Sequence, residues 1–146
     1  MSNHAACNLP LDRSADPPLD ARPLWRKAAP MPSRKTAQRL CELVALATAA
    51  AFAVPVGELV ASSRRSPYIA FARQSAMYLA HVTCGLNYSE VGRAFGRDRT
   101  TAAHACRLIE DRRDDPAVDA VLGSLENACG MLRRRLSAQV QVQVRP

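Results

Sequence analysis

The sequence predicts an all-α fold, a helical bundle that contains a helix-turn-helix and is flanked by disordered tails. Apolar residues recur at three- and four-residue spacing in several segments, which is the period of an amphipathic helix. Prolines, glycines and capping residues divide these segments into helices of ordinary length. Only the end of the chain, from Val140, alternates apolar and polar residues as a strand does, and it has no second strand to pair with.

A length of 146 residues allows one domain with tails. Residues 1–33 are polar and aperiodic, and they contain Pro10, Pro17, Pro18, Pro23, Pro30 and Pro32. This composition predicts a disordered, proline-rich N-terminal tail, which is a candidate contact for a protein partner. The folded domain is expected over residues 34–135, and residues 136–146 are expected to form a flexible C-terminal tail.

The first helix is expected from about residue 34 to residue 54, with Ser33 as its N-cap. Its apolar stripe consists of Ala37, Leu40, Cys41, Val44, Ala47, Thr48, Ala51 and Phe52. Pro55 ends it, and residues 55–60 predict a short helical turn. A small basic loop follows at residues 62–67 and contains Arg64 and Arg65.

The third helix is expected from about residue 69 to residue 83, where Gly85 ends it. Its buried stripe consists of Ala72, Ala76, Met77, Leu79, Ala80 and Cys84, while Arg73, Gln74, Ser75 and His81 lie outside the stripe. Asn87 and Glu90 form a capping-box pattern that opens a fourth helix. The apolar side of that helix is Val91, Ala94 and Phe95.

Gly96 turns the chain, and Asp98 is a good N-cap for a fifth helix. The core side of this helix is expected to be Ala102, Ala105, Cys106 and Ile109, and its outer side Arg99, Thr100, Ala103 and Arg107. Pro116 suits the first position of a sixth helix, which is expected to run through about Arg135.

The composition points to a polyanion or an acidic partner. The formal net charge is +7, from 20 Lys and Arg against 13 Asp and Glu, and Lys27 and Lys35 are the only lysines. Arginine suits phosphate and guanine better than lysine does, because its planar guanidinium donates two parallel hydrogen bonds. No apolar run is long enough to span a membrane, and the N-terminus has no apolar signal core. We therefore expect a cytoplasmic, nucleoid-associated protein without a membrane partner.

Two short helices joined by a glycine turn match the helix-turn-helix, whose second helix enters the DNA major groove with its N-terminal residues toward the bases. Arg99 suits guanine, Thr100 suits a thymine methyl group, and Asp98 can accept from a cytosine amino group. Arg97 and Arg107 can hold phosphates. The pattern alone leaves another interpretation open, because helix pairs with a glycine turn also occur in proteins that bind no DNA, where such arginines form a solvated face.

Three segments resemble the C-terminal DNA-binding domain of the bacterial replication initiator DnaA: 73–80 (RQSAMYLA), 88–101 (YSEVGRAFGRDRTT) and 104–107 (HACR). The resemblance covers roughly residues 36–132, with the segments in the family's order. It implies a helical bundle that binds a short A·T-rich site in double-stranded DNA.

The resemblance also implies a role for individual residues. Arg65, with Arg64 beside it, would enter the minor groove. Arg73 and Gln74 would hold phosphates, and Thr101 would contact the DNA backbone. Asp98, Arg99 and Thr100 would contact bases. Tyr88 and Ser89 occupy positions where the family contacts the groove edge.

Two departures from the family pattern predict an altered DNA preference. The family usually has two glycines before the Arg-Asp pair, and only Gly96 stands here. The family usually has histidine at the position of Arg99. A shorter turn would rotate the recognition helix, and an arginine prefers guanine where a histidine is less selective.

Other chemistry has weaker support. The sequence contains no Gly-x-x-x-x-Gly-Lys-Ser/Thr phosphate loop, so we expect a DNA-binding regulator of transcription or replication without ATPase activity. His81 with Cys84, and His104 with Cys106, do not provide four converging zinc ligands, and no catalytic triad is evident. We therefore expect no cofactor, no metal and no enzyme activity. The alternative is a protein-interaction module that keeps the initiator fold but binds a protein partner.

Overall fold

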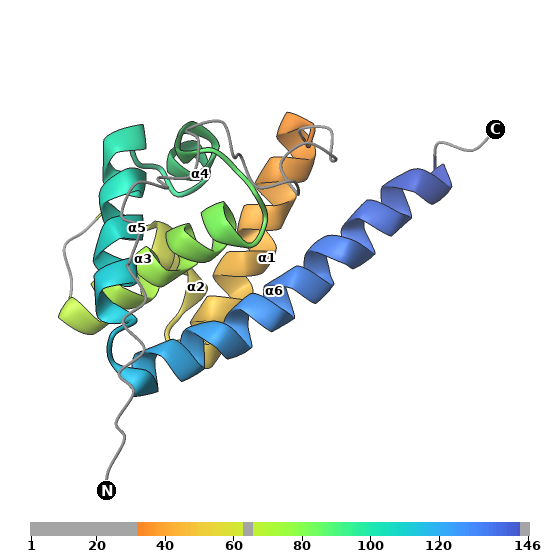
Figure 1. The fold of residues 1–146 in the computed structure, drawn as a ribbon. Helices are drawn as coiled ribbons and strands as arrows, with labels where there is room; N and C mark the ends of the chain where they lie inside the picture. The colour runs from red at the N-terminus through yellow and green to blue at the C-terminus, as the bar shows by residue number, and fades with distance from the viewer. Residues whose placement is uncertain (1–31, 63–65, 144–146) are drawn as a thin grey trace, which may run out of the picture. The chain divides into compact units, whose positions relative to one another are not determined.

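The computed structural model describes residues 32–62 and 66–143, which are helical throughout apart from short connections. The helices in this part of the chain are α1 (Arg34–Phe52), α2 (Val56–Val60), α3 (Pro67–Val82), α4 (Tyr88–Ala94), α5 (Arg99–Arg112) and α6 (Pro116–Gln143) (Figure 1). The predicted all-α bundle with a helix-turn-helix is confirmed. The N-terminal tail predicted over residues 1–33 falls, up to residue 31, outside the described residues.

Helix α3 is the centre of the bundle, because it packs against each of the other five helices. Its middle is covered on every side, and Ala72, Ala76, Leu79 and Ala80 are fully buried. The small alanine side chains let the neighbouring helices approach closely. Ser75 is also fully buried, although its position in the sequence predicts an outward orientation. The prediction fails there because neighbouring helices cover every side of α3 over residues 75–80.

The helix caps follow the local sequence. Ser33 and Ser66 accept hydrogen bonds from the backbone at the starts of α1 and α3. Asn87 and Glu90 form the predicted capping box at the start of α4, with both bonds at 2.9 Å. These side chains satisfy backbone N–H groups that the first turn of a helix leaves unpaired, so each start is determined locally.

Helix α6 is longer than the sequence predicts. It continues to Gln143, although the pattern places its end near Arg135 with a flexible tail from residue 136. No glycine or proline interrupts residues 136–143, and Leu136 packs partly against the hydrophobic core, so nothing ends the helix there. Figure 1 shows the C-terminal part of α6, in darker blue, extending past the other helices of the bundle.

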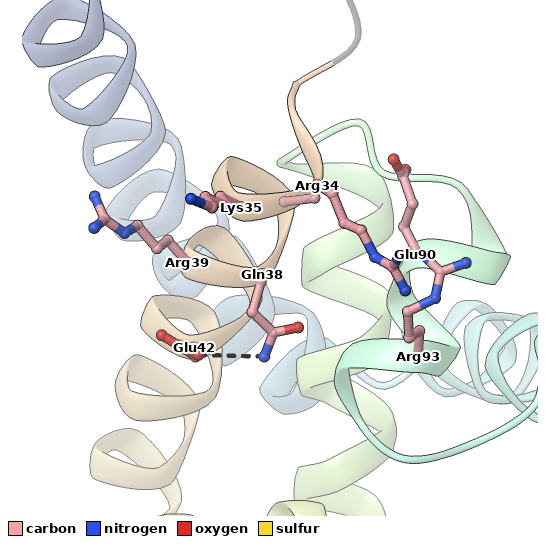
Figure 2. Close-up of a pocket in the computed structure, with 8 residues that line it drawn as sticks. Arg34, Lys35, Gln38, Arg39, Glu42, Glu90 and Arg93 are labelled. Atoms are coloured by element: carbon pink, nitrogen blue, oxygen red, sulfur yellow. Dashed lines mark hydrogen bonds between the residues drawn. The ribbon is translucent and has the colours of Figure 1, made fainter.

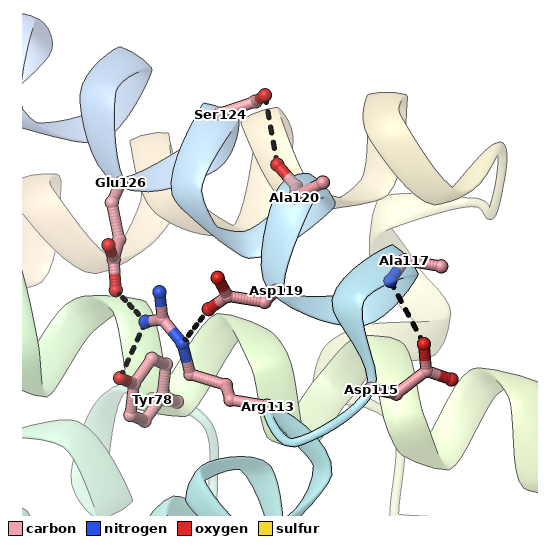
Figure 3. Close-up of polar contacts among 8 residues, drawn as sticks. All are labelled: Tyr78, Arg113, Asp115, Ala117, Asp119, Ala120, Ser124 and Glu126. Carbon is pink, nitrogen blue, oxygen red and sulfur yellow. Dashed lines mark hydrogen bonds and ion pairs between the residues drawn. The ribbon is translucent and has the colours of Figure 1, made fainter. Parts of the chain in front are cut away.

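The C-terminal end of α5 is attached to α6 and α3 through Arg113 (Figure 3). Its guanidinium donates to Asp119 at 2.6 Å, to the Tyr78 hydroxyl at 2.9 Å, and to Glu126. It also lies over the Tyr78 ring. These partners raise the pKa of Arg113 above its usual range, with the Glu126 carboxylate as the largest cause. The network fixes the angle at which α6 leaves α5.

Candidate nucleic-acid interface

The turn between α4 and α5 is unusually tight because of Gly92. The Arg97 N–H donates to the Gly92 carbonyl at 2.7 Å. A Cβ atom on Gly92 would lie 2.8 Å from the carbonyl oxygens of both Arg97 and Asp98. That is closer than real Cβ contacts, so only glycine allows the backbone of the turn to approach the helix this closely. Gly96 completes the turn with a positive φ of 62°.

The first turn of α5 presents polar side chains on a fixed backbone. Asp98 Oδ1 accepts a hydrogen bond from the Thr101 N–H at 2.6 Å, as predicted for an N-cap. The same bond lowers the pKa of Asp98, so its carboxylate is ionised at neutral pH. Arg99, Thr100 and Thr101 are exposed. A rigid helix start with a guanidinium and two hydroxyl groups suits base edges and phosphates.

The start of α4 is supported from α3. The Tyr88 ring stacks on His81, with ring centroids 4.2 Å apart and planes 27° apart. His81 Nδ1 is 2.7 Å from the Leu86 carbonyl oxygen, which holds the imidazole in place. Tyr88 is therefore a fixed, half-buried side chain, while its neighbour Ser89 is exposed.

Arg73 and Arg97 both bond the C-terminal end of α2. Arg73 donates to the Leu59 carbonyl at 2.9 Å and to the Glu58 carbonyl at 2.7 Å. Arg97 donates to the Ala61 carbonyl, also at 2.7 Å. Cations are favoured at a helix C-terminus, where carbonyl oxygens lack partners within the helix. Burial, and next the nearby Arg97 charge, lower the pKa of Arg73.

The sequence predicts that Arg73 and Arg97 extend to phosphates, whereas these bonds hold both side chains against the protein. Both guanidiniums are half-buried and join α2 to α3 and to the helix-turn-helix. The Nη1 group of Arg73 and that of Arg97 take no part in these bonds, so phosphate contact by either residue stays a prediction. The structure adds a structural role that the sequence pattern did not indicate.

The remaining predicted DNA-binding residues divide by location. Gln74 is half-buried on α3, and Arg107 is exposed on α5. Arg64 and Arg65 lie outside the described residues, so their predicted minor-groove contact has no structural test. Their loop begins directly after Ala61, the residue that Arg97 bonds. The backbone at the root of the basic loop is thus tied to the turn of the helix-turn-helix.

Gly92 is the functional position that sequence reasoning missed. A glycine inside an expected helix lowers helix stability, so its presence between Val91 and Arg93 signals a packing reason. The helix-turn-helix pattern points to Gly96 instead, because that glycine stands between the two expected helices. The partner of Gly92 is the backbone five and six residues later, which helical periodicity alone does not indicate.

The described cysteines form no reactive site. Cys41, Cys84, Cys106 and Cys129 are buried and free, and burial raises the pKa of the first three thiols to about 12 and of Cys129 to about 11. Such thiols stay protonated and behave as small apolar side chains. Across residues 32–62 and 66–143, no three His, Cys, Asp or Glu side chains gather as a metal site requires. None of the helices in this part of the chain has the length and apolar character needed to cross a bilayer.

Comparison with known proteins places this geometry in a family. Residues 41–109 match the sequence model of the bacterial dnaA protein helix-turn-helix. A solved structure described as a DNA replication initiation factor aligns with a TM-score of 0.61 and 28% identity, over 73% of this chain and 31% of the other. A second, described as replication initiator DnaA bound to AMPPCP and single-stranded DNA, aligns with a TM-score of 0.59, the same identity and the same coverage.

The chain spans about a third of the length of these two relatives. The matched region runs from α1 to α5, so it includes the Gly92 turn, the Asp98 cap and the arginine bonds to α2. The domain of this family binds DNA and is not a catalytic domain. Residues 41–109 of this chain therefore belong to the family of DnaA-type helix-turn-helix domains.

Proposed function

We propose that the chain binds a specific site in double-stranded DNA and acts as a regulator of transcription or replication without ATPase activity. The observation that carries the proposal is the first turn of α5, where Arg99, Thr100 and Thr101 are exposed on a helix start that Asp98 caps. Sequence is read by side chains at such a helix start in the major groove. The proposed site is A·T-rich and similar to the initiator box.

The bond between Arg97 and Ala61 supports contact with two DNA grooves, the minor groove by the basic loop and the major groove by α5. Arg64 and Arg65 follow Ala61 by three and four residues, so they start from a backbone point attached to the helix-turn-helix. A basic loop that starts beside the recognition helix suits a neighbouring minor groove, where arginine is attracted to the narrow A·T-rich form. Loop and helix would then contact one stretch of duplex.

Arg99 supports an altered preference within that site. A guanidinium can donate two hydrogen bonds to O6 and N7 of guanine, and the ionised Asp98 beside it can accept from a cytosine amino group. The preferred site should therefore hold at least one G·C pair where the recognition helix starts. Selection from random duplexes tests this, and recovery of the ordinary initiator box without change would contradict it.

Binding to an A·T-rich duplex, measured by fluorescence anisotropy over a series of salt concentrations, tests the proposal directly. The logarithm of affinity should fall with the logarithm of salt, with a slope of about −0.9 per phosphate contact. Arg99→Ala should cost about 1–3 kcal/mol of discrimination between bases. Arg107→Ala, one of the predicted phosphate contacts, is the matched control and should weaken binding to all sequences alike. Absence of binding, or a flat salt dependence, would overturn the proposal.

Two further measurements test the regulatory part. Mapping bound sites across the genome should show either clusters at the replication origin or sites spread over promoters, and the first result would favour replication control. Incubation of the chain with ATP should release no phosphate above background. Hydrolysis that DNA stimulates would contradict the statement that the regulator works without ATPase activity.

A further inference from the structure

An apolar hollow lies between α1, α2 and α4, on residues that the proposed DNA contacts do not use. Its floor is the buried Cys41 and Phe95, and its volume is about 520 Å³. The rim carries three large apolar side chains that remain exposed: Leu46 at 53%, Val56 at 40% and Val60 at 48%. Single exposed apolar residues are ordinary, but a group around a concave floor indicates a contact surface.

A second, basic hollow lies beside the apolar one, toward the start of α1, and Figure 2 shows the residues that line it. The two hollows share Gln38 and Glu42, so they adjoin, and together they are called the groove. The basic end is lined by Arg34, Lys35, Arg39 and Arg93, together with Glu42 and Glu90. Figure 2 shows that Arg34 extends from α1 toward Arg93 on α4, whereas Lys35 and Arg39 extend from the other side of α1.

Among the residues that the structure describes, the cations of this basic end have no carboxylate partner. Within the described part of the chain, the ion pairs are those that Arg113 makes with Asp119 and Glu126. The two carboxylates of the groove have other contacts, since Glu42 accepts from Gln38 and Glu90 accepts from the Asn87 backbone. Four cations against two occupied carboxylates leave an excess of positive charge at one end of an apolar groove.

We propose that this groove binds an amphipathic helix of a protein partner. The apolar side chains of that helix pack on Leu46, Val56 and Val60. Its acidic residues lie beside Arg34, Arg39 and Arg93. Helix-in-groove recognition uses apolar anchors at spacings of three and four residues, and complementary charge sets the orientation. DNA fits less well, because the apolar half offers nothing to a phosphate. A second copy also fits poorly, because the net charge of +7 would bring like charges together. The inference does not depend on the proposed DNA-binding function.

Selection from a library of random peptides long enough for about four helical turns tests the proposal on the full chain. The peptides that are enriched should carry apolar residues at helical spacing and an excess of Asp and Glu toward one end. Their affinity is then measured with wild-type protein and with variants whose helical content and thermal unfolding match the wild type. Enrichment of no peptide, or of peptides without the acidic excess, would overturn the proposal.

Matched variants locate the binding surface. Leu46→Gln and Arg39→Glu should each weaken peptide binding by about tenfold, and Val60→Gln serves if Leu46→Gln does not fold. Met131→Gln and Arg134→Glu, at exposed positions of α6 outside the groove, should leave it unchanged. Equal effects of groove and control variants would overturn the proposal. So would a loss of duplex binding in Arg39→Glu without a loss of peptide binding, because the groove would then be a DNA surface.

Discussion

The two ends of α5 carry arginines in opposite circumstances. At the N-terminal end, Arg99 is exposed at the helix start that Asp98 caps. At the C-terminal end, Arg113 is held by Tyr78, Asp119 and Glu126, with only 25% of its side chain exposed. One end leaves its guanidinium available to a ligand, and the other uses it to fasten three helices together.

The difference shows that an arginine's role is decided by the partners within its reach. Arg113 follows α5 directly and faces two carboxylates of α6, which come 6 and 13 residues later. Arg99 directly follows the Asp98 cap, and its side chain is exposed. Arg73 and Arg97 lie between these extremes. Arg73 bonds two carbonyls of α2, Arg97 bonds the carbonyl of its C-cap Ala61, and each keeps a further donor group. The residue type alone does not distinguish an exposed arginine, an arginine bonded to carboxylates, and an arginine bonded to the end of a helix.

The largest effect is expected from Gly92→Ala, which acts on the N-terminal end. The added Cβ meets the backbone of Arg97 and Asp98 at 2.8 Å, and backbone cannot yield as a flexible side chain does. Overpacking of this kind costs about 1–3 kcal/mol, and the value should lie at the upper end. The start of α5 must shift, so DNA affinity should fall as well. Urea unfolding and anisotropy measure the two effects.

Gly123→Ala is the control for that prediction. Apart from the adjoining backbone of its own helix, no atom lies within 4 Å of a Cβ placed there, and the position is inside helix α6. Alanine should stabilise the helix by about 0.5–1 kcal/mol and leave DNA affinity unchanged. If Gly92→Ala behaved like Gly123→Ala, the tight turn would not be what positions the recognition helix.

A second prediction concerns the C-terminal end of α5, which should affect stability and not DNA binding. Arg113→Met should lower the free energy of unfolding by about 2 kcal/mol, because it removes charge-assisted bonds to Glu126, Asp119 and the Tyr78 hydroxyl. Affinity for DNA should not change under conditions where the protein is folded. Arg134→Met, at an exposed position of α6, is the control and should change stability by less than about 0.5 kcal/mol. A loss of DNA affinity in Arg113→Met would show that both ends serve binding.

A third prediction tests whether Arg73 stabilises the fold, contacts phosphate, or does both. Arg73→Met should cost about 1–2 kcal/mol of stability, since two bonds to the end of α2 are lost. If Arg73 also contacts phosphate, the salt slope of DNA binding should become shallower by about 0.9. Arg107→Met is the comparison, with the same slope change expected and no stability change, because its side chain is exposed. Unchanged stability in Arg73→Met would show that its two bonds to the end of α2 do not stabilise the fold.

The smallest effect concerns pH and the Asp98 cap. Its hydrogen bonds with Thr101 lower the pKa of Asp98, so the folded state favours the carboxylate. The resulting stability is present above the unfolded pKa of about 3.9 and is lost as the pH falls through the lower folded value. Asp98→Asn keeps an acceptor but does not titrate. The stability difference between wild type and Asp98→Asn should therefore shrink in acid, as urea unfolding at several pH values would reveal.

The control for the pH prediction is Asp111→Asn, at an exposed position in the last turn of α5. This substitution also removes one carboxylate but leaves the cap of α5 intact, so it is the reference for the loss of one charge. A difference between wild type and Asp98→Asn that does not vary with pH would mean that the charge of the cap adds nothing to its hydrogen bond.

Much of the fold could be predicted because its signals are local. Ser33, Asn87 and Asp98 begin helices through bonds to backbone three residues away, and Gly85 and Gly96 turn the chain with positive φ. Ser66 does the same for α3, which therefore begins at Pro67 and not near residue 69 as predicted. The inward face of α5 was predicted correctly, since Ala102, Ala105, Cys106 and Ile109 are all buried. Apolar spacing along one helix is enough to place such a face.

The sequence by itself determined the helices, their caps and the polar first turn of α5, because these depend on contacts within a few residues. Only the tertiary structure decided that Ser75 is buried, that Gly92 must be glycine, and that Arg73 and Arg97 bond the end of α2. It also brought Leu46 and Val60 to one hollow, and Arg93 from a third helix to the hollow beside it. Those relations join residues far apart in the chain or depend on how helices pack, and periodicity within one segment contains no information about them.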